Sequence, residues 1–494
     1  MIFAATLVCI CVVAGLFYLD REKGSLSHAL WLPGLWVAIV GSRPVSMWFG
    51  VSGSGSQLDG SPVDAACLGI LLVGAIAVLI ARNRRAGVLL RSNWPILIYF
   101  AYCLLSVAWS PHADVSLKRW IKSLGDPAMA LVIVTDPRPL AAIRTLVSRL
   151  GFLFFPFSLL LIRYYGTFGR SYTAEGEPVN IGVCPNKNAL GLIVLMISMV
   201  ILWNVRWLWN HKKEPNRSRH LAAQGVLLGF GALLFWQANC STAKACFALG
   251  ALMMVVSNMR FIKTKPARVH AVTFAIIVLA VTTLFWGGQA EVAGALGRES
   301  SMSGRTDIWE AVIPTVRNPL LGAGYDGFWI SPSADVFHQK LLEMGWYPAV
   351  VLHTTEAHDG YIETYLNLGW IGVGLLAILL ITGYQRAFKA FQRDPELGGL
   401  LLAFVAAVAI YSITEAGFRA LNPAWIFLLV AIFASSGVTT GIFAAKKASP
   451  SRRGDAVRGF DPKELVPESG AAALRRASAA AGLSGGGTQP FNLN

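Results

Sequence analysis

The sequence predicts an all-α polytopic integral membrane protein. Of its 494 residues, 55% are hydrophobic and only 14% are charged, and the mean hydropathy is +0.55, far above that of an average soluble domain. A helix of about 20 apolar residues crosses a hydrocarbon core, and windows of that length recur along most of the chain. The sequence therefore predicts about 12–13 transmembrane helices.

The apolar windows give the positions of the expected spans. They lie near residues 2–19, 29–48, 63–81, 94–109, 120–134, 146–162, 188–205, 221–238, 244–258, 269–287, 366–385, 397–415 and 422–441. The fifth is the weakest, because Gly125, Asp126 and Pro127 interrupt it. The first lacks a basic segment and a small-residue cleavage site, so we expect a retained span rather than a signal peptide.

Basic residues gather in alternate connections, which predicts the orientation of the chain. The clusters lie near residues 82–91, 206–219, 260–268 and 386–393. The positive-inside rule assigns these connections to the cytoplasm. The N-terminus is then outside and the C-terminus inside. The net charge of +15 follows mostly from this topology, and no nucleic-acid partner is expected.

The chain divides into four expected regions. Residues 1–289 carry the N-terminal transmembrane helices, and residues 366–441 carry the C-terminal ones. Residues 290–365 form one long periplasmic loop, and connections of such length are often functional, so the loop should hold the chemistry. Residues 445–494 are rich in Ala, Gly, Ser and Arg without apolar periodicity, which predicts a disordered cytoplasmic tail.

The first half of the long loop contains "SMSGRTDIWEAVIPTVRNPLLGAGYDGFW", which predicts a turn, a short helix and a second turn. Thr306 or Ser303 can cap the helix, and Asp307 and Glu310 suit its first turn. Arg305 then precedes the helix start, where unpaired N–H groups favour an anion. A salt bridge within the loop is the plainer interpretation of this arginine.

The second half of the loop ends in a group of polar residues ahead of an apolar run. These are His353, Glu356, His358, Asp359 and Glu363. The spacing of the histidines fits no zinc motif and puts them on different sides of a helix, so no metal site is expected. Asp359 suits a helix N-cap, and Glu363 suits a solvated position at the helix entrance. His358 can accept a proton near neutral pH.

Other ionisable residues are expected on the same side of the membrane. Lys187 stands at the polar entrance of a span, and Lys244 lies between two spans joined by a very short loop. Glu415 and Arg419 are four residues apart, a spacing that favours an ion pair on a helix. Each ionisable group at membrane depth costs roughly 2.5–3.5 kcal/mol, so several on one side are a reason to look for function.

Several segments together resemble the O-antigen ligase and polysaccharide polymerase superfamily, which includes exopolysaccharide polymerases. They are "SRPVSMWFG" with "DGSPVD", "LSVAWSPHADVSLKRWIKSLGD", "PNKNALG", "SGRTDIWEAVIPTVRNPLLGAGYDGFW", "AHDGYIETYLNLGWIG" and "TEAGF". They are spread over the chain up to about residue 440. The order and spacing of the last three carry the resemblance most specifically.

The resemblance implies a GT-C-like, all-helical membrane glycosyltransferase of the bacterial inner membrane. Such an enzyme moves a glycan from an undecaprenyl diphosphate carrier to an acceptor hydroxyl on the periplasmic side, without a metal or another cofactor. Its implied partners are the lipid-linked glycan, an acceptor glycan or glycolipid, the lipid bilayer and other polysaccharide-assembly proteins. Arg305 and His358 match its functional residues, whereas Lys244 and Asn186 stand where an arginine and a histidine are common.

Elementary chemistry gives these residues roles that agree with the resemblance. Arg305 can bind phosphate oxygens bidentately, with Lys244 or Lys187 as point charges, and so stabilise a diphosphate leaving group. His358 can take the proton of the acceptor hydroxyl. Further contacts to the diphosphate or the glycan are expected from Glu363, Glu415 and Arg419.

The sequence is also compatible with two other functions. Within the same family, the chain could attach a finished polymer to lipid A-core instead of polymerising repeat units. In a different class, it could transport lipid-linked glycans. A transporter would need broken helices in corresponding halves and ionisable residues near the bilayer midplane, and the sequence contains neither an internal repeat nor such residues.

Overall fold

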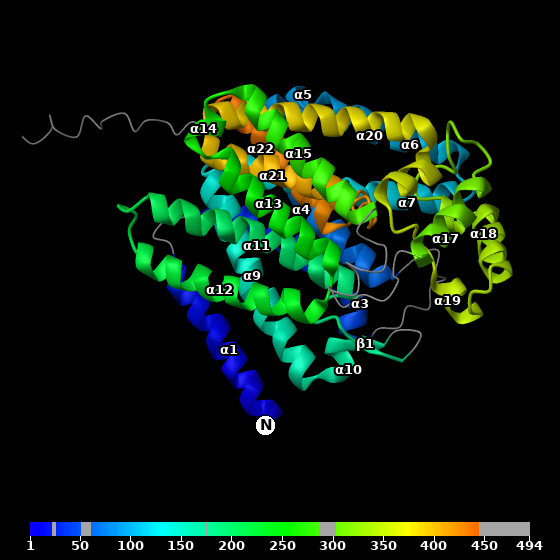
Figure 1. Ribbon diagram of the computed structural model, residues 1–494, viewed down its shortest axis with the longest axis horizontal. Helices are drawn as coiled ribbons and strands as arrows, with labels where there is room; N and C mark the ends of the chain where they lie inside the picture. Colours follow the sequence, from blue (N-terminus) through cyan, green and yellow to red (C-terminus); the bar gives the residue numbers. More distant parts are fainter. Residues whose placement is uncertain (22–25, 51–60, 173–175, 286–302, 444–494) are drawn as a thin grey trace, which may run out of the picture. The chain divides into compact units, whose positions relative to one another are not determined.

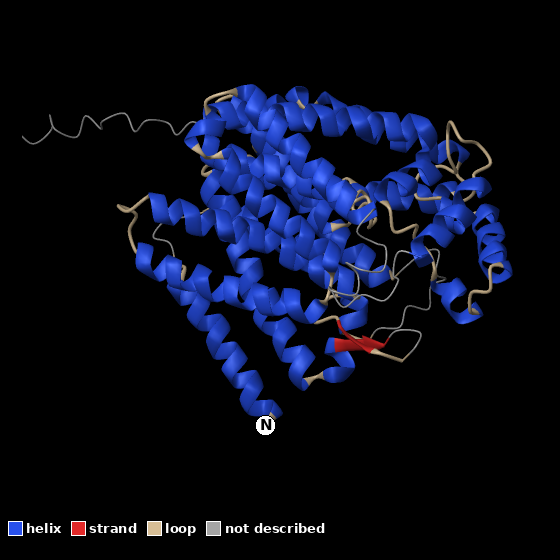
Figure 2. Ribbon diagram, in the orientation of Figure 1, coloured by secondary structure: helices blue, strands red, loops and turns tan. Residues whose placement is uncertain are grey.

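The computed structural model describes residues 1–21, 26–50, 61–172, 176–285 and 303–443. Nearly all of their regular structure is helical, and the exception is an antiparallel pair of short strands (Figure 2). In this pair, β1 (Arg170–Tyr172) runs against β2 (Pro178–Asn180). The expected all-α class is confirmed. The expected tail and residues 290–302 of the long loop lie outside the described residues.

The helices are arranged along the chain as follows (Figure 1). Before the loop come α1 (Ile2–Leu19), η1 (His28–Leu30), α2 (Trp31–Val40), α3 (Val45–Trp48), α4 (Pro62–Ala81), α5 (Asn83–Ser92), α6 (Trp94–Ser106), η2 (Val107–Trp109), α7 (Ala113–Ser123), α8 (Gly125–Val134), α9 (Pro139–Tyr164), α10 (Gly166–Gly169), α11 (Lys187–Asn210), α12 (Arg217–Ala238), α13 (Ser241–Ser257), α14 (Arg260–Lys263) and α15 (Pro266–Phe285). The loop contributes α17 (Ser303–Val312), η3 (Ile313–Thr315), η4 (Phe328–Ile330), α18 (Pro332–Glu343) and α19 (Pro348–His353). Three helices follow it: α20 (Gly360–Arg393), α21 (Pro395–Tyr411) and α22 (Pro423–Thr439).

Several of these helices can cross a membrane. Among the described residues, six are long and apolar enough, namely α1, α4, α9, α11, α12 and α20. A pair bent by 84°, formed by α5 with residues 94–109, gives a seventh candidate, and five shorter apolar helices accompany them. The chain is therefore a multi-pass membrane protein. The larger number of spans expected from the sequence stays a prediction.

The centre of the helical bundle is formed by α9, α11, α21 and α22. Large shares of the apolar windows of α9 and α11 are buried, whereas α1 and α4 expose most of theirs. Both α20 and α13 pack against α21, and α8 packs against α22. Residues of α21 and α22 are buried on nearly all sides. Helices that are apolar all round and surrounded by other helices suit this central position.

The span expected at 120–134 is divided between Ser123, where α7 ends, and Gly125, where α8 begins. A Cβ on Gly125 would lie 2.0 Å from the ring of Trp36, so only glycine fits there. The next residue, Asp126, is fully buried and accepts hydrogen bonds from Nε1 of Trp36 (3.0 Å) and from the backbone N–H of Leu421 (2.8 Å). The polar interruption is therefore a packing point that ties α8 to the connection between α21 and α22.

Helix α20 is broken at Gly369, whose φ is +62°. The backbone groups released by the break are bonded to the glycine-rich turn of the loop, residues 319–327. These bonds run from Trp370 to Pro319 (2.9 Å), from Ala323 to Leu366 (2.9 Å) and from Gly324 to Asn367 (2.8 Å). Unpaired backbone groups are costly at membrane depth, so this pairing fixes the loop against the helix. The helix begins at Gly360, ahead of the span expected at 366–385, and Asp359 caps its first turn.

The described part of the long loop has a hydrophobic core of its own. Helices α17, α18 and α19 gather beside the N-terminal end of α20 (Figure 1). The core is made of Ile308, Ala311, Val312, Phe328, Phe337, Leu341, Val351, Ala357 and Leu366. Leu366 belongs to α20, so the small core includes the helix on which the loop rests. A packed core of this kind can hold catalytic side chains in fixed positions.

Candidate functional site

The segment ahead of α20 fixes the backbone on both sides of His358. The N–H of Ala357 donates to Oε1 of Glu363 (2.6 Å), and its carbonyl accepts from Nε1 of Trp309 (2.8 Å). Asp359 caps α20 by accepting from the first backbone N–H groups of the helix, as expected. His358 itself has a φ of +51°, a left-handed conformation that costs about 1–3 kcal/mol outside glycine. The hydrogen bonds of Ala357 and Asp359 therefore hold the backbone of His358 in this left-handed conformation.

The position of Glu363 differs from the expectation. Its side chain is buried rather than solvated, and its carboxylate also accepts from Nε1 of Trp329 (3.0 Å). Glu363 lies on the α20 face that the loop covers, and periodicity alone could not reveal that cover. Its contacts make it an anchor of the loop, through Trp329 and Ala357.

Arg305 lies within α17 rather than ahead of it. The helix begins at Ser303, so Asp307 and Glu310 are not in its first turn. Ile308, Ala311 and Val312 of α17 belong to the small core, and Arg305 extends towards the α21–α22 connection. There its Nη2 lies 2.7 Å from Oε1 of Glu415, whose side chain is only 7% exposed. An arginine paired with a buried carboxylate is held firmly.

The expected ion pair between Glu415 and Arg419 is wrong. Both residues lie in the connection between α21 and α22, so helical i,i+4 geometry does not apply to them. Glu415 pairs with Arg305, and Arg419 instead faces Glu356 (Nη1 to Oε2, 3.5 Å) and Asp326 (Nη2 to Oδ1, 3.9 Å).

These contacts form an alternating series of positive and negative side chains, which we call the charge chain. Its members, in order of contact, are Arg119, Asp326, Arg419, Glu356, His358, Glu415 and Arg305. Arg119 belongs to α7, and Glu415 and Arg419 belong to the α21–α22 connection. The other four side chains belong to the long loop, with Arg305 on its helix α17. Arg119 and Arg419, which are 300 positions apart in the sequence, are thereby brought to one place.

The charge chain sets the protonation of His358. Its Nδ1 lies 2.9 Å from Oε1 of Glu356 and 3.8 Å from Oε2 of Glu415, and the ring N–H is not aligned for a hydrogen bond to either. Burial disfavours the charged imidazolium, but the two carboxylates outweigh this effect and raise the pKa of His358 to about 9. Burial likewise opposes ionisation of Glu356, yet His358 and Arg419 lower the pKa of this carboxyl. His358 and Glu356 therefore form a charged pair at neutral pH.

Three members of the charge chain could in principle hold a metal ion. One ligand atom each from Glu356, His358 and Glu415 lies within 4.8 Å of the other two. Both carboxylates already face arginines, so a metal ion bound there would have to displace these ion pairs and the proton of His358.

A cavity of about 240 Å³ lies beside the charge chain and is the candidate substrate site. Glu356, Glu415 and Arg419 line it from one side. Asn186 and Asn422 also line it, and they are the N-caps of α11 and α22. The positive ends of two long helices therefore meet at this cavity, and such ends attract anions.

The two candidate lysines lie near this region but have different surroundings. Lys187 is exposed at the first position of α11, next to the cavity-lining Asn186. Lys244 is in the first turn of α13, after a connection of two residues, as expected. Its ammonium donates to Oδ1 of Asn239 (3.2 Å), within that short turn. Lys187 is thus the better placed of the two beside the cavity.

Sequence reasoning missed three members of the site. Arg119 and Asp326 were inside motifs that carried the family resemblance, but no role followed from them. Their contact is close, since Nη1 of Arg119 donates to the backbone carbonyl of Asp326 (2.7 Å) and lies 3.3 Å from its carboxylate. Glu356 was noted only as a polar neighbour of His358. A charged residue kept inside an apolar or glycine-rich motif is the signal that could have identified them.

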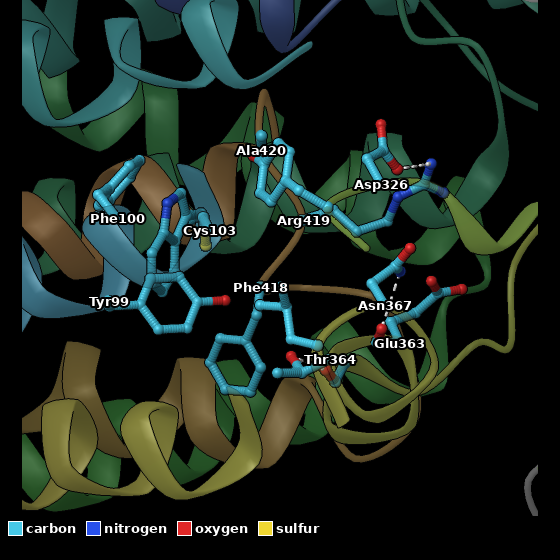
Figure 3. A pocket seen from close by; sticks show the side chains of 14 residues that line it. Tyr99, Phe100, Cys103, Asp326, Glu363, Thr364, Asn367, Phe418, Arg419 and Ala420 are labelled. Carbon is cyan, nitrogen blue, oxygen red and sulfur yellow. Dashed lines mark hydrogen bonds and ion pairs between the residues drawn. The ribbon is translucent and has the colours of Figure 1, made fainter. Parts of the chain in front are cut away.

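A second cavity, of about 80 Å³, adjoins the first and shares Arg419 and Ala420 with it (Figure 3). It lies between α6, the start of α20 and the α21–α22 connection. Its lining combines aromatic rings, such as Tyr99 and Phe418, with polar side chains, such as Asp326 and Asn367. The charge chain therefore runs along the boundary of two cavities of different character.

The fold and the site together define a multi-pass, all-α membrane protein with a charged site built from residues of α7, of the segment 303–359 and of the α21–α22 connection. Residues 224–377 match the family model described as O-antigen ligase. The exopolysaccharide production protein ExoQ of Rhizobium meliloti (strain 1021) is 25% identical over 313 residues, which are 61% of this chain and 67% of that protein. These two matches confirm the resemblance to the O-antigen ligase and polysaccharide polymerase family.

Proposed function

We propose that this protein is a glycosyltransferase that moves a glycan from a lipid diphosphate carrier to an acceptor hydroxyl. The observation that carries the proposal is the 240 Å³ cavity, where two helix N-termini meet the charge chain. A diphosphate is the anion that such a site suits, because its oxygens can face the helix ends and the arginines together. The family supports glycosyl transfer as the class of reaction.

Arg305 has the central electrostatic role in this proposal. When the bond between the sugar C1 and the diphosphate oxygen breaks, the electron pair leaves with the diphosphate and negative charge develops on its oxygens. Arg305 can meet two of these oxygens with its planar fork, in competition with Glu415. Arg419 adds positive charge at the cavity wall, Lys187 adds it from the position next to the cavity-lining Asn186, and Lys244 is assigned as a further point charge.

We assign His358 the role of general base for the acceptor hydroxyl. As the acceptor oxygen bonds to C1, its hydroxyl proton must leave, and the imidazole can take it when neutral. The charged pair with Glu356 orients the ring, and Glu415 connects the base to the arginine that stabilises the leaving group. Both halves of the reaction are thereby coupled through one buried carboxylate. No metal is needed in this scheme, because organic cations supply the positive charge.

The orientation of the site follows from the charge asymmetry of the connections. We assign the protein to the bacterial inner membrane, with residues 290–365 and the charge chain on the periplasmic side and the tail from 445 in the cytoplasm. An undecaprenyl chain would keep the diphosphate at the membrane surface, where the charge chain meets the start of α20. Other polysaccharide-assembly proteins are proposed as partners.

Within this class, polymerisation of repeat units is favoured over ligation to lipid A-core, because ExoQ is described as an exopolysaccharide production protein. The test is the glycan profile of a deletion strain. We expect loss of the polymer with single lipid-linked repeat units retained. Accumulation of full-length polymer without attachment to lipid A-core would instead identify a ligase, and an unchanged envelope glycan would contradict both.

A further inference from the structure

The 80 Å³ cavity has a chemistry that the diphosphate does not explain. Figure 3 shows Tyr99, Phe418, Arg419, Asp326 and Asn367 around the same space. Trp425 completes an aromatic group, with its ring centroid 5.8 Å from that of Tyr99 and 6.1 Å from that of Phe418. Rings thus border one part of the cavity, and planar polar groups border another.

This combination favours a neutral polyol over the alternatives. Asp326 and Glu363 both line the cavity, so a phosphate would meet negative charge there. A purely apolar lipid chain would exclude water from the polar side chains that border the cavity and would offer them no hydrogen bond in return. A sugar ring offers an apolar C–H face to aromatic rings and hydroxyl groups that both donate to carboxylates and accept from Arg419.

The location of the cavity connects it to the candidate base. Gly360 lines it, two residues after His358, and Arg419 joins it to the larger cavity. A group held in the smaller cavity therefore lies on one side of the charge chain, with the helix N-termini on the other. A transfer reaction needs two substrates that meet in this way, one of them anionic and the other carrying the attacking hydroxyl.

We propose that the smaller cavity binds the acceptor sugar, an assignment that rests on the transfer reaction proposed above. Its volume of about 80 Å³ takes part of one sugar ring, so recognition is directed at the terminal residue of the acceptor. Phe418 contacts the sugar ring, and the hydroxyl of Tyr99, together with Asn367 and Arg419, forms hydrogen bonds with the sugar hydroxyls. The larger cavity is left for the donor diphosphate.

The test is a kinetic comparison of Tyr99→Phe with Tyr102→Phe in the purified full-length protein. Both changes remove one tyrosine hydroxyl from α6, but only Tyr99 lines the cavity, whereas Tyr102 donates to the carbonyl of Leu368 (3.1 Å). The donor is the host's lipid diphosphate-linked repeat unit. The acceptor is a soluble oligosaccharide prepared from the host's polymer, which lacks a diphosphate and cannot act as a donor.

Loss of one hydrogen bond to the acceptor should raise the acceptor KM of Tyr99→Phe about tenfold. Its donor KM should not change, and Tyr102→Phe should have a wild-type acceptor KM. Equal effects of the two variants, or a change in the donor KM of Tyr99→Phe, would overturn the assignment. If the wild-type protein joins lipid-linked repeat units to one another but transfers nothing to the soluble acceptor, the assignment is overturned, because the terminal sugar is then not what the enzyme recognises. Absence of both transfers would contradict the proposed function itself, a failure visible without either variant.

Discussion

Arg305→Ala is expected to abolish glycan transfer while the protein level and membrane insertion remain those of the wild type. The side chain reaches from α17 to Glu415, which lines the larger cavity, and its removal takes away the planar fork that we assign to the diphosphate. Loss of one such stabilising group typically costs about 10²–10³-fold in rate. The measurement is polymer formation in membranes of a deletion strain carrying each variant at matched protein level.

Two further variants separate charge from geometry. Arg305→Lys keeps the charge but not the two parallel donors, so it should restore little activity. Arg317→Ala, a change at an exposed arginine of the same loop, should leave activity at the wild-type value. Full activity of the lysine variant would show that bidentate binding is not the reason for the arginine. Equal losses in Arg305→Ala and Arg317→Ala would point to loop charge in general.

His358→Gln is expected to lower transfer by about 10²–10⁴-fold, because glutamine can keep a hydrogen bond but cannot take the proton. The wild-type enzyme should also show an alkaline pH dependence. A base must be neutral to act, and Glu356 and Glu415 raise the pKa of His358 to about 9. The kcat/KM, which reports the free enzyme, should therefore rise from pH 7 towards pH 9 and then level off.

This pH profile distinguishes two roles of the histidine. Without its carboxylate neighbours, an imidazole would level off at about pH 6.5. Glu356→Gln removes one carboxylate, so the rise in kcat/KM should move to lower pH in that variant. If kcat/KM falls between pH 7 and pH 9, the imidazolium is the active form, and His358 stabilises charge instead of accepting a proton. Wild-type rates for His358→Gln would make it a structural residue of the loop.

Much of the fold follows from apolar windows, because a membrane helix must satisfy its backbone within itself. The interruption at Asp126 was recognised in the sequence, but its reason was not. That carboxylate bonds to Trp36 and Leu421, from two distant segments, and so fixes the α21–α22 connection. A local pattern can indicate that a polar residue is unusual, but it cannot name partners that only the folded chain brings near.

In the candidate site, too, the sequence indicated individual residues but not the partners that folding brings to them. Motif resemblance identified Arg305 and His358, and the structure brings both to Glu415. The i,i+4 spacing gave Glu415 the wrong partner, because it assumed a helix where the chain forms a connection. Asp326 and Arg119 were missed because their pairing joins the glycine-rich turn to α7, a contact that depends on how the loop packs.

Glycan transfer by the purified chain in liposomes tests the central claim most directly. The liposomes contain the lipid diphosphate-linked repeat unit, and the measured products are lengthened glycan and released carrier diphosphate, in EDTA and in added Mg²⁺. The account predicts that both products form together, at the same rate in the two conditions, and that Arg305→Ala forms neither. Passage of the intact lipid-linked glycan across the bilayer without a new glycosidic bond, or transfer that stops in EDTA, would contradict it.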